Sequence, residues 1–282
     1  MSARNSRREI SDAVVLMAGA GSRLRSNGSA LPKPLLPILG RPLISYTLEA
    51  IARAGIENVY LIVGFESELV IARTSPLIPP ELNVRFIHNP QWKKQNGISV
   101  LSAAGQVRSP FLLTMSDHIF DETVLDILIR NAKSGALNLA VDRKLDSIFD
   151  VDDAMKVQTR GDRIIAIGKE LKQYDAIDTG AFVCGEDIFD YLARAKRDDD
   201  CSLADGVRLA AAEGKARAVD VKEGWWQDVD TPEMLAYAEQ RLRRSLGGKT
   251  ADLVVPPSDR GNHGKSKARQ RHPRPQVKNP LR

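Results

Sequence analysis

The stretch that decides the fold of this chain is AVVLMAGAGSRLRSNGSALPKPLLPILGRPLI, residues 13–44. Its first five residues, 13–17, are apolar and predict a buried strand, because a short apolar run that ends at turn residues is typical of a parallel sheet. A glycine loop, residues 19–23, follows this strand directly, and Lys33 comes ten residues after the loop, between two prolines. Strand, glycine loop and proline-flanked lysine are therefore interpreted together.

The loop and the lysine have the chemistry of a polyphosphate site. Glycines leave backbone N–H groups open to phosphate oxygens, and Arg23 and Lys33 add positive charge. The prolines hold the lysine segment extended, because the proline ring fixes φ. The usual third glycine of a dinucleotide fingerprint would fall at Leu24, so that motif is incomplete. A surface loop with incidental cations is the alternative. The favoured prediction is a triphosphate site formed by Ala18, Gly19, Ala20, Gly21, Ser22, Arg23 and Lys33.

The rest of the chain predicts an α/β fold. Strands are expected at residues 58–63, 83–87 and 111–115, and helices at residues 42–54, 98–107 and 122–132. Such alternation indicates a Rossmann-like, mostly parallel sheet flanked by helices. Closely spaced strands at residues 137–141, 155–158, 164–167 and 176–184 predict antiparallel additions, so the sheet should be mixed. Helices at 187–195, 203–213 and 231–246 and a strand at 217–221 complete the prediction.

Composition divides the chain into three parts: a flexible N-terminus over residues 1–11, one domain over residues 12–248, and a disordered basic tail over residues 249–282. The tail holds nine Lys/Arg and two Asp/Glu, whereas the other residues hold 32 basic and 34 acidic side chains. The overall charge of +5 therefore comes from the tail, which argues against a nucleic-acid-binding domain. The tail has no aromatic residues to stack on bases, so any polyanion binding by it should be weak.

Two further features bear on the compartment. Cys184 and Cys201 are the two cysteines, too few for a disulfide framework or a zinc cluster, and both are expected to be reduced and packed. No apolar run approaches the roughly 18 residues of a membrane span. These features favour a cytoplasmic protein without a membrane segment.

Carboxylates follow two of the predicted elements. Asp117 ends an apolar strand in MSDH, residues 115–118, and Asp228 and Asp230 lie in WQDVDTPE, residues 226–233. Ligands bind at the carboxyl ends of strands in open α/β sheets, where a carboxylate can hold Mg²⁺ against a triphosphate. Helix capping is the alternative role for Asp117, and also for Asp230 or Thr231. His118 is assigned no chemistry.

The loop and lysine segments together resemble the pyrophosphorylase-type nucleotidylyltransferases of the nucleotide-diphospho-sugar transferase superfamily, over about residues 12–246. Further segments resemble inositol-1-phosphate cytidylyltransferases, which make CDP-inositol from CTP and inositol 1-phosphate. They are QNGIS (95–99), MSDH (115–118), AVDR (140–143), DAMKV (153–157) and AIDTG (176–180). The resemblance implies the fold of that superfamily, CTP and a small phosphorylated alcohol as partners, and Mg²⁺ on Asp117 and on Asp228 or Asp230, with Asp230 favoured.

The same resemblance implies the remaining site residues. Arg23, Lys33 and Lys156 would be the catalytic cations, with Lys156 holding the acceptor phosphate. The nucleotide would contact Gln95, Asn96, Gly97 and Ser116. The acceptor would contact Asp142, Lys156, Asp178, Thr179 and Gly180. The acceptor phosphate is already anionic, so the reaction needs no general base, only positioning and charge stabilisation during in-line attack on the α-phosphorus.

Several alternatives remain open. A cytidylyltransferase for phosphocholine or a phosphonate should show aromatic residues around a cationic head group, and aromatic residues make up only 5% of this chain. A hexose-1-phosphate nucleotidylyltransferase using UTP or dTTP would share the same loop. A non-catalytic sugar-nucleotide sensor is disfavoured, because the cations and carboxylates of the site are present. A homo-oligomer is compatible with the sequence.

Overall fold

A computed structural model describes residues 10–25 and 31–251. The N-terminal segment over residues 1–9, and the tail from residue 252 onward, lie outside the described residues, so the predictions for them stay predictions. The chain divides into a unit Met1–Arg243 and a second unit Arg244–Arg282. The part of the second unit that is described is the end of α8 (Pro232–Ala251). Apart from the C-terminal end of α8, all that follows concerns the first unit.

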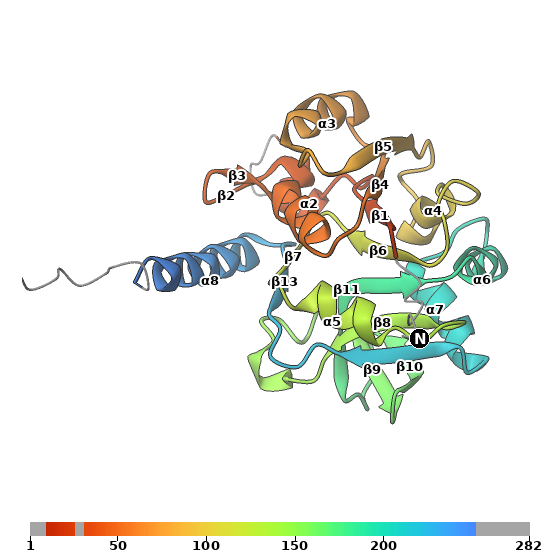
Figure 1. Cartoon of the computed structure of the whole chain (residues 1–282). Coiled ribbons are helices and arrows are strands. Elements are labelled where there is room, and N and C mark those ends of the chain that lie inside the picture. The colour runs from red at the N-terminus through yellow and green to blue at the C-terminus, as the bar shows by residue number, and fades with distance from the viewer. Residues whose placement is uncertain (1–9, 26–30, 252–282) are drawn as a thin grey trace, which may run out of the picture. The chain divides into compact units, whose positions relative to one another are not determined.

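Nine strands of the described residues form one mixed sheet, in the order β5-β4-β1-β6-β11-β8-β12-β10-β9 (Figure 1). β1 (Asp12–Leu16) lies parallel to both β4 (Asn58–Val63) and β6 (Phe111–Met115), and β4 lies parallel to β5 (Asn83–His88). Of these nine strands, β10 (Arg163–Gly168) and β11 (Ala176–Cys184) run opposite to the rest. The predicted α/β fold with a mixed sheet is confirmed.

β11 changes its neighbour halfway along one edge. Its first half pairs with β9 (Lys156–Arg160), with Ala176 opposite Val157, and its second half pairs with β6, with Phe182 opposite Leu113. Its other edge follows β8 (Leu137–Asp142), and there the register shifts between Asp178 and Phe182. β12 (Ala216–Asp220) continues the sheet beside β8. The strands β6 and β9 therefore diverge beside residues 178–181.

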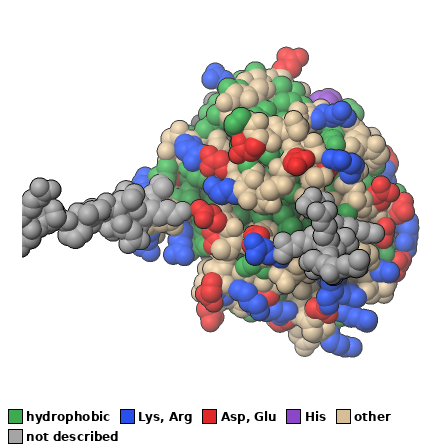
Figure 2. Space-filling model, in the orientation of Figure 1, with side chains coloured by type: hydrophobic (Ala, Val, Ile, Leu, Met, Phe, Trp, Pro, Cys, Tyr) green, Lys and Arg blue, Asp and Glu red, His purple; other side chains and the backbone are tan. Residues whose placement is uncertain are grey.

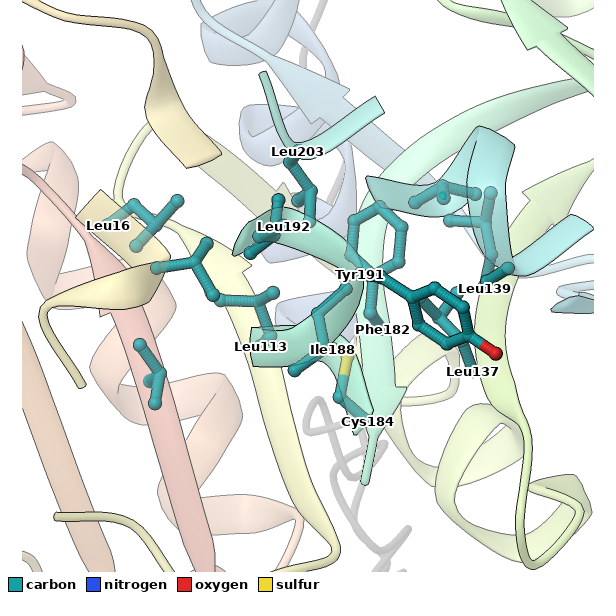
Figure 3. Packing of buried hydrophobic residues seen from close by; sticks show 14 of the residues in the cluster. Leu16, Leu113, Leu137, Leu139, Phe182, Cys184, Ile188, Tyr191, Leu192 and Leu203 are labelled. Atoms are coloured by element: carbon teal, nitrogen blue, oxygen red, sulfur yellow. The ribbon is translucent and has the colours of Figure 1, made fainter. Parts of the chain in front are cut away.

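Helices cover both faces of the sheet. Successive side chains of a buried strand point to opposite faces, so each such strand packs against both helical layers. Val14 and Leu16 of β1 pack in one cluster with α4 (Asn96–Leu101), α6 (Asp187–Ala195) and α7 (Leu203–Ala212). Ala13 and Val15 pack in the opposite cluster with α2 (Leu43–Arg53), α3 (Ser67–Thr74) and α5 (Val124–Asn131). Figure 3 shows α6 placing Ile188 and Leu192 in the first of these clusters. Both cysteines are buried and free, as expected.

A short antiparallel ribbon brings a late segment back to the end of β6. β7 (His118–Phe120) pairs with β13 (Trp226–Asp228), with His118 opposite Asp228. Beside it, β2 (Pro37–Ile38) pairs with β3 (Arg41–Pro42). β2 and the start of α8 share an apolar cluster that includes Ile38, Ile119 and Val229. The ribbon was not predicted, because its strands have three residues each and are too short to show an alternation of apolar and polar side chains.

Four helices depart from the predictions, and one of them, α1 (Ser22–Arg25), begins inside the predicted glycine loop. The helix predicted over residues 98–107 is α4, which ends at Leu101 and continues in turns up to Gly105, where φ is +71°. α8 reaches Ala251 instead of Leu246, since Gly247 and Gly248 weaken a helix but keep their N–H groups, and no proline follows before Pro256. α3 was missed because it buries only Val70 and Thr74.

Within the described residues, no helix combines the length and apolarity needed to cross a membrane. Figure 2 shows acidic and basic side chains interspersed over the visible face. This agrees with the nearly balanced charge of residues 1–248.

Asp12 at the start of β1 ties three segments together. Its fully buried carboxylate accepts hydrogen bonds from the backbone and side chain of Arg108, at 3.0 Å each, and from Asn58 Nδ2 at 3.0 Å. Burial alone would raise the pKa of Asp12, but the hydrogen bonds from Arg108, Asn58 and Ser11 lower it.

Replacing Asp12 with Asn should therefore lower the free energy of unfolding by about 1–3 kcal/mol at pH 7, since donors to the lost oxygen stay unpaired. A lowered pKa contributes stability above the pKa of the unfolded chain, so the difference from wild type should shrink as the pH falls below about 4. Urea unfolding at several pH values measures both effects. Asp126→Asn, which removes an exposed ion pair with Arg130, is the matched control and should change stability by less than about 1 kcal/mol.

Candidate functional site

The glycine loop and the lysine segment contact each other directly. Gly21 has φ +59°, and a Cβ built on it would lie 2.6 Å from Lys33 Cβ. Lys33 begins the short helix η1 (Lys33–Leu35), and it is only 8% exposed. The predicted pairing of loop and lysine is therefore a packed contact, and a glycine at position 21 is needed for both its backbone conformation and its lack of a side chain.

Lys33 Nζ donates hydrogen bonds to Asp117 Oδ2 and to Asp230 Oδ1. Asp117 follows β6 and Asp230 follows β13, so the β7–β13 ribbon brings the two carboxylates to one ammonium. Burial alone would lower the pKa of Lys33, but the two carboxylates raise it. Burial alone would raise the pKa of Asp117, but Lys33 and His118 lower it. Lys33 and Asp117 are therefore both charged at neutral pH.

Two more cations, Arg23 and Lys169, extend this group of three residues into a row of alternating positive and negative side chains. Arg23 Nη2 lies 3.5 Å from Asp230 Oδ2, and Arg23 Nη1 donates to Asp153 Oδ2 at 2.7 Å. Lys169 Nζ donates to the other oxygen of Asp153 at 2.6 Å. The order Lys169, Asp153, Arg23, Asp230, Lys33, Asp117 thus joins residues from six segments of the chain.

Two cavities lie along this row. One, of about 270 Å³, is lined by the loop residues Gly19 and Gly21 and by Arg23, Lys33, Ser116, Asp117 and Asp230. The other, of about 430 Å³, is lined by His118, Asp178, Gly180, Asp153, Lys169, Asp228 and Asp230, among others. Asp230 lines both. A larger hollow of about 1100 Å³ lies elsewhere, beside the first residues of β8, and none of the predicted site residues lines it.

Residues other than the candidate metal carboxylates accept the hydrogen bonds at the starts of α5 and α8. Asp121 Oδ1 accepts hydrogen bonds from Thr123 and Val124 at the start of α5, and Thr231 Oγ1 accepts one from Met234 N in α8. Asp228 lines the larger cavity, and burial and the neighbouring Asp230 raise its pKa. Since Asp230 shares Lys33 with Asp117, the geometry favours Asp230 over Asp228 as the partner of Asp117.

The predicted acceptor residues divide into two groups. Asp142 Oδ2 accepts from Trp226 Nε1 at 3.0 Å and Oδ1 accepts from Lys144, while Thr179 Oγ1 donates to the backbone of Ala140. These two side chains hold the wall of the cavity. Asp142, Asp178 and Gly180 line the cavity itself, whereas Thr179 does not. Burial raises the pKa of Asp178 to about 6, against the hydrogen bond that Gly180 N donates to it.

Lys156 does not line either cavity. Its ammonium donates to the carbonyl oxygens of Asp152, at 3.0 Å, and Lys169, at 2.9 Å, and is 5.8 Å from the ring centre of Tyr174. Lys169 lines the larger cavity instead. Sequence reasoning missed Lys169, although its position at the end of a strand, one residue after Gly168, was a usable signal.

The segment Gln95-Asn96-Gly97 lies beside the loop before α7. Asn96 Oδ1 accepts from Leu203 N at 2.8 Å, Gln95 N donates to Asp200, and a Cβ on Gly97 would lie 2.6 Å from Cys201 O. These residues do not line the phosphate-loop cavity. Ala18 O accepts from Phe65 N, Ala20 is half-buried, and the side chain of Ser22 lies outside the described residues.

Aromatic side chains gather at the larger cavity, which the low aromatic content did not suggest. Phe149, Trp225, Trp226 and Tyr237 line it. Phe149 stacks on Tyr237 with ring centres 4.8 Å apart, and Trp226 stacks on His118 at 6.2 Å. The argument from composition against a cationic acceptor is therefore weaker than the sequence suggested.

The carboxylates fit a cation that arrives with a nucleotide. Among the described side chains, no group of three or more His, Cys, Asp or Glu residues is arranged to hold a metal alone. Asp117 and Asp230 nevertheless reach one cation, the ammonium of Lys33. Mg²⁺ is usually bound by one or two carboxylates together with substrate phosphates, which agrees with this pair.

Comparisons with known proteins agree with this geometry. Residues 13–148 match the family described as MobA-like NTP transferase domain. A "Bifunctional IPC transferase and DIPP synthase" of Aquifex aeolicus is 32% identical over 237 residues, which are 83% of this chain and 52% of that protein. The protein of the same name from Rubrobacter xylanophilus is 33% identical over 85% of this chain and 53% of its own length. The chain thus spans about half the length of these curated relatives.

A solved structure has a similar fold. The inositol-1-phosphate CTP transferase of T. maritima superposes with a TM-score of 0.72 and 25% identity, covering 87% of this chain and 98% of that one.

The contact between Gly21 and Lys33 predicts a loss of function without a loss of fold. Gly21→Ala should lower turnover at least about tenfold, because the new Cβ displaces the lysine segment, and a shift of about 1 Å can cost a hundredfold. Gly105→Ala is the matched control. Gly105 also has a positive φ, of +71°, but no atom lies within 4 Å of its Cβ position. Both variants should lose similar stability in thermal unfolding, but Gly105→Ala should keep normal turnover. Equal turnover in the two variants would contradict the packed loop.

Proposed function

We propose that this chain, whose residues 13–148 match the MobA-like NTP transferase domain, is a nucleotidyltransferase that transfers CMP from CTP to inositol 1-phosphate, giving CDP-inositol and pyrophosphate. The observation that carries the proposal is the row of alternating charge that joins two neighbouring cavities, with Asp230 lining both. One cavity has the glycine loop for a triphosphate, and the other has polar groups and a cation for a phosphorylated alcohol.

The chain's own groups supply the chemistry by charge and position. The loop N–H groups, Arg23 and Lys33 hold the triphosphate, and Lys169 attracts the acceptor phosphate from the other cavity. The acceptor oxygen then attacks the α-phosphorus in line, and these cations stabilise the charge that develops on pyrophosphate. Asp117 and Asp230 would hold Mg²⁺, which offsets the repulsion between the two anions when it is bound.

In this proposal, Lys169 replaces Lys156 as the group that binds the acceptor phosphate. Lys169 is 41% exposed at its side chain, lines the cavity and is held by Asp153, whereas the ammonium of Lys156 is bonded to two backbone carbonyls. One of those carbonyls belongs to Lys169 itself. Lys156 therefore supports the segment that carries the binding cation.

The choice of CTP and inositol 1-phosphate is supported by the T. maritima neighbour, whose name gives both, and by the segments that resemble cytidylyltransferases of this kind. Asp178 offers a carboxylate with one oxygen bonded to Gly180 N, so it can accept hydrogen bonds from ring hydroxyls. A pocket built for such hydroxyls rejects substrates that lack them, because its buried groups would be left unpaired.

One observation favours a second candidate, a cytidylyltransferase for phosphocholine or an aminoalkylphosphonate. Phe149 and Tyr237 stack beside Asp178 and Asp228 in one cavity. Aromatic faces and carboxylates together bind cationic head groups.

Pyrophosphate release distinguishes these candidates. The full chain with Mg²⁺ should use CTP and inositol 1-phosphate with the highest kcat/KM among inositol 1-phosphate, phosphocholine, an aminoethylphosphonate and glucose 1-phosphate. EDTA should abolish the reaction, because Asp117 and Asp230 alone leave the two anions to repel each other. A preference for phosphocholine or the phosphonate would establish the second candidate, and a preference for glucose 1-phosphate with UTP or dTTP would refute both.

Lysine substitutions test the acceptor assignment. Lys169→Ala should raise the KM for the phosphorylated acceptor at least about tenfold and leave the KM for CTP within about twofold, because its charge faces only the acceptor cavity. Lys156→Met keeps the aliphatic stem and should mainly lower the melting temperature, since two carbonyls lose their donor. Steady-state kinetics and thermal unfolding of both variants provide the comparison. An acceptor-specific KM effect in Lys156→Met alone would restore the original assignment.

A further inference from the structure

His118 links the two cavities, although neither its type nor its position predicted a role. It directly follows Asp117 and is buried, with its side chain 11% exposed. Its Nδ1 lies 2.7 Å from Asp117 Oδ1. Because Asp117 is ionised, its carboxylate can only accept hydrogen bonds, so Nδ1 carries the proton and donates it. The other oxygen of Asp117 accepts from Lys33.

The far side of the imidazole is fixed by packing. A Cβ on Gly180 would lie 2.3 Å from His118 Nε2, so the ring fits only because position 180 is a glycine. The ring also lies nearly parallel to Trp226, with planes 10° apart, and Trp226 is itself held by Asp142. Hydrogen bonding on one side and packing on the other leave the imidazole a single orientation.

The two ends of this arrangement face different cavities. His118 and Gly180 line the larger cavity, whereas Asp117 lines the cavity of the glycine loop. The hydrogen bond between His118 and Asp117 thus crosses the wall that separates them. Gly180 lies where β11 exchanges β9 for β6 as its neighbour, so this wall stands at the divergence of the sheet.

We propose that His118 is a positioning residue, which orients the Asp117 carboxylate toward the phosphate loop and couples that orientation to occupancy of the acceptor cavity. The inference rests on the proposed function, because it assumes that Asp117 holds a divalent cation with the nucleotide. His118 itself touches neither the nucleotide nor the reacting phosphorus. It acts through Asp117 on one side and forms part of the acceptor wall on the other.

Two isosteric substitutions separate these contributions. In His118→Asn, the side-chain amide nitrogen replaces Nδ1 and can still donate to Asp117, but the ring that lines the acceptor cavity is lost. In His118→Gln, the amide reaches the position of Nε2 beside Gly180, and the donor to Asp117 is lost. Circular dichroism and thermal unfolding show whether each variant folds.

The main measurement is binding of Mn²⁺ in the presence of CTP, followed by electron paramagnetic resonance. His118→Gln should weaken Mn²⁺ at least about tenfold, the scale found when a group that orients a metal ligand is removed, whereas His118→Asn should stay within about threefold of wild type. The KM for inositol 1-phosphate should rise more in His118→Asn than in His118→Gln. Equal Mn²⁺ affinity in all three proteins, or weaker Mn²⁺ binding in His118→Asn than in His118→Gln, would overturn the proposal.

Wild-type protein provides a second measurement that does not depend on variant folding. In ¹⁵N-histidine spectra, one slowly exchanging imidazole should carry its proton on Nδ1, and its resonance should shift on addition of inositol 1-phosphate alone. A buried imidazole protonated on Nε2 only would refute the role of His118. If wild type binds no Mn²⁺ in the presence of CTP, the proposed function itself fails. If wild type binds Mn²⁺ with CTP but the Asn and Gln variants do not differ, only the role of His118 fails.

Discussion

A buried ammonium between two carboxylates is the interaction on which this site depends. Lys33 is 8% exposed, and its partners Asp117 and Asp230 lie 84 and 197 positions away in the chain. Removing an ammonium from water is costly unless opposite charges and hydrogen bonds surround it. Lys33 is therefore stable at this place only when the glycine loop, the end of β6 and the segment after β13 are all correctly folded. The charge of Lys33 thus makes the placement of these three segments interdependent.

Two features of the sheet bring these segments together. The β7–β13 ribbon sets His118 opposite Asp228, which places Asp230 beside the end of β6. The change of neighbour along β11 separates β6 from β9 and leaves room beside Gly180 for the acceptor cavity. Both features interrupt regular pairing, and regular pairing would close the sheet where the cavities lie. The geometry of the candidate site therefore depends on irregular parts of an otherwise regular fold.

Local signals in the sequence predicted the strands, most of the helices and the phosphate loop, because each depends on nearby residues. The glycine loop and Lys33 were predicted as a pair, and the structure brings them into contact. Lys169 was missed and Lys156 chosen, because both are lysines at strand ends and only tertiary contacts show which ammonium is bonded to backbone carbonyls. Composition likewise could not show that Phe149, Trp225, Trp226 and Tyr237 converge on one cavity. A property that arises from residues far apart in the chain has no local signal.

The alternating row also determines what kind of ligand the site can accept. Lys33 and Arg23 are each already paired with a carboxylate, so an isolated anion at the glycine loop must compete with Asp117, Asp230 and Asp153 for them. Such competition cancels much of the attraction, since a displaced half-buried carboxylate is left without a counter-charge. A triphosphate that arrives with a divalent cation brings a new partner for the carboxylates as well as for the cations. In the proposed function, the charges around the glycine loop are thus complementary to a metal–nucleotide complex and only weakly attractive to a bare phosphate.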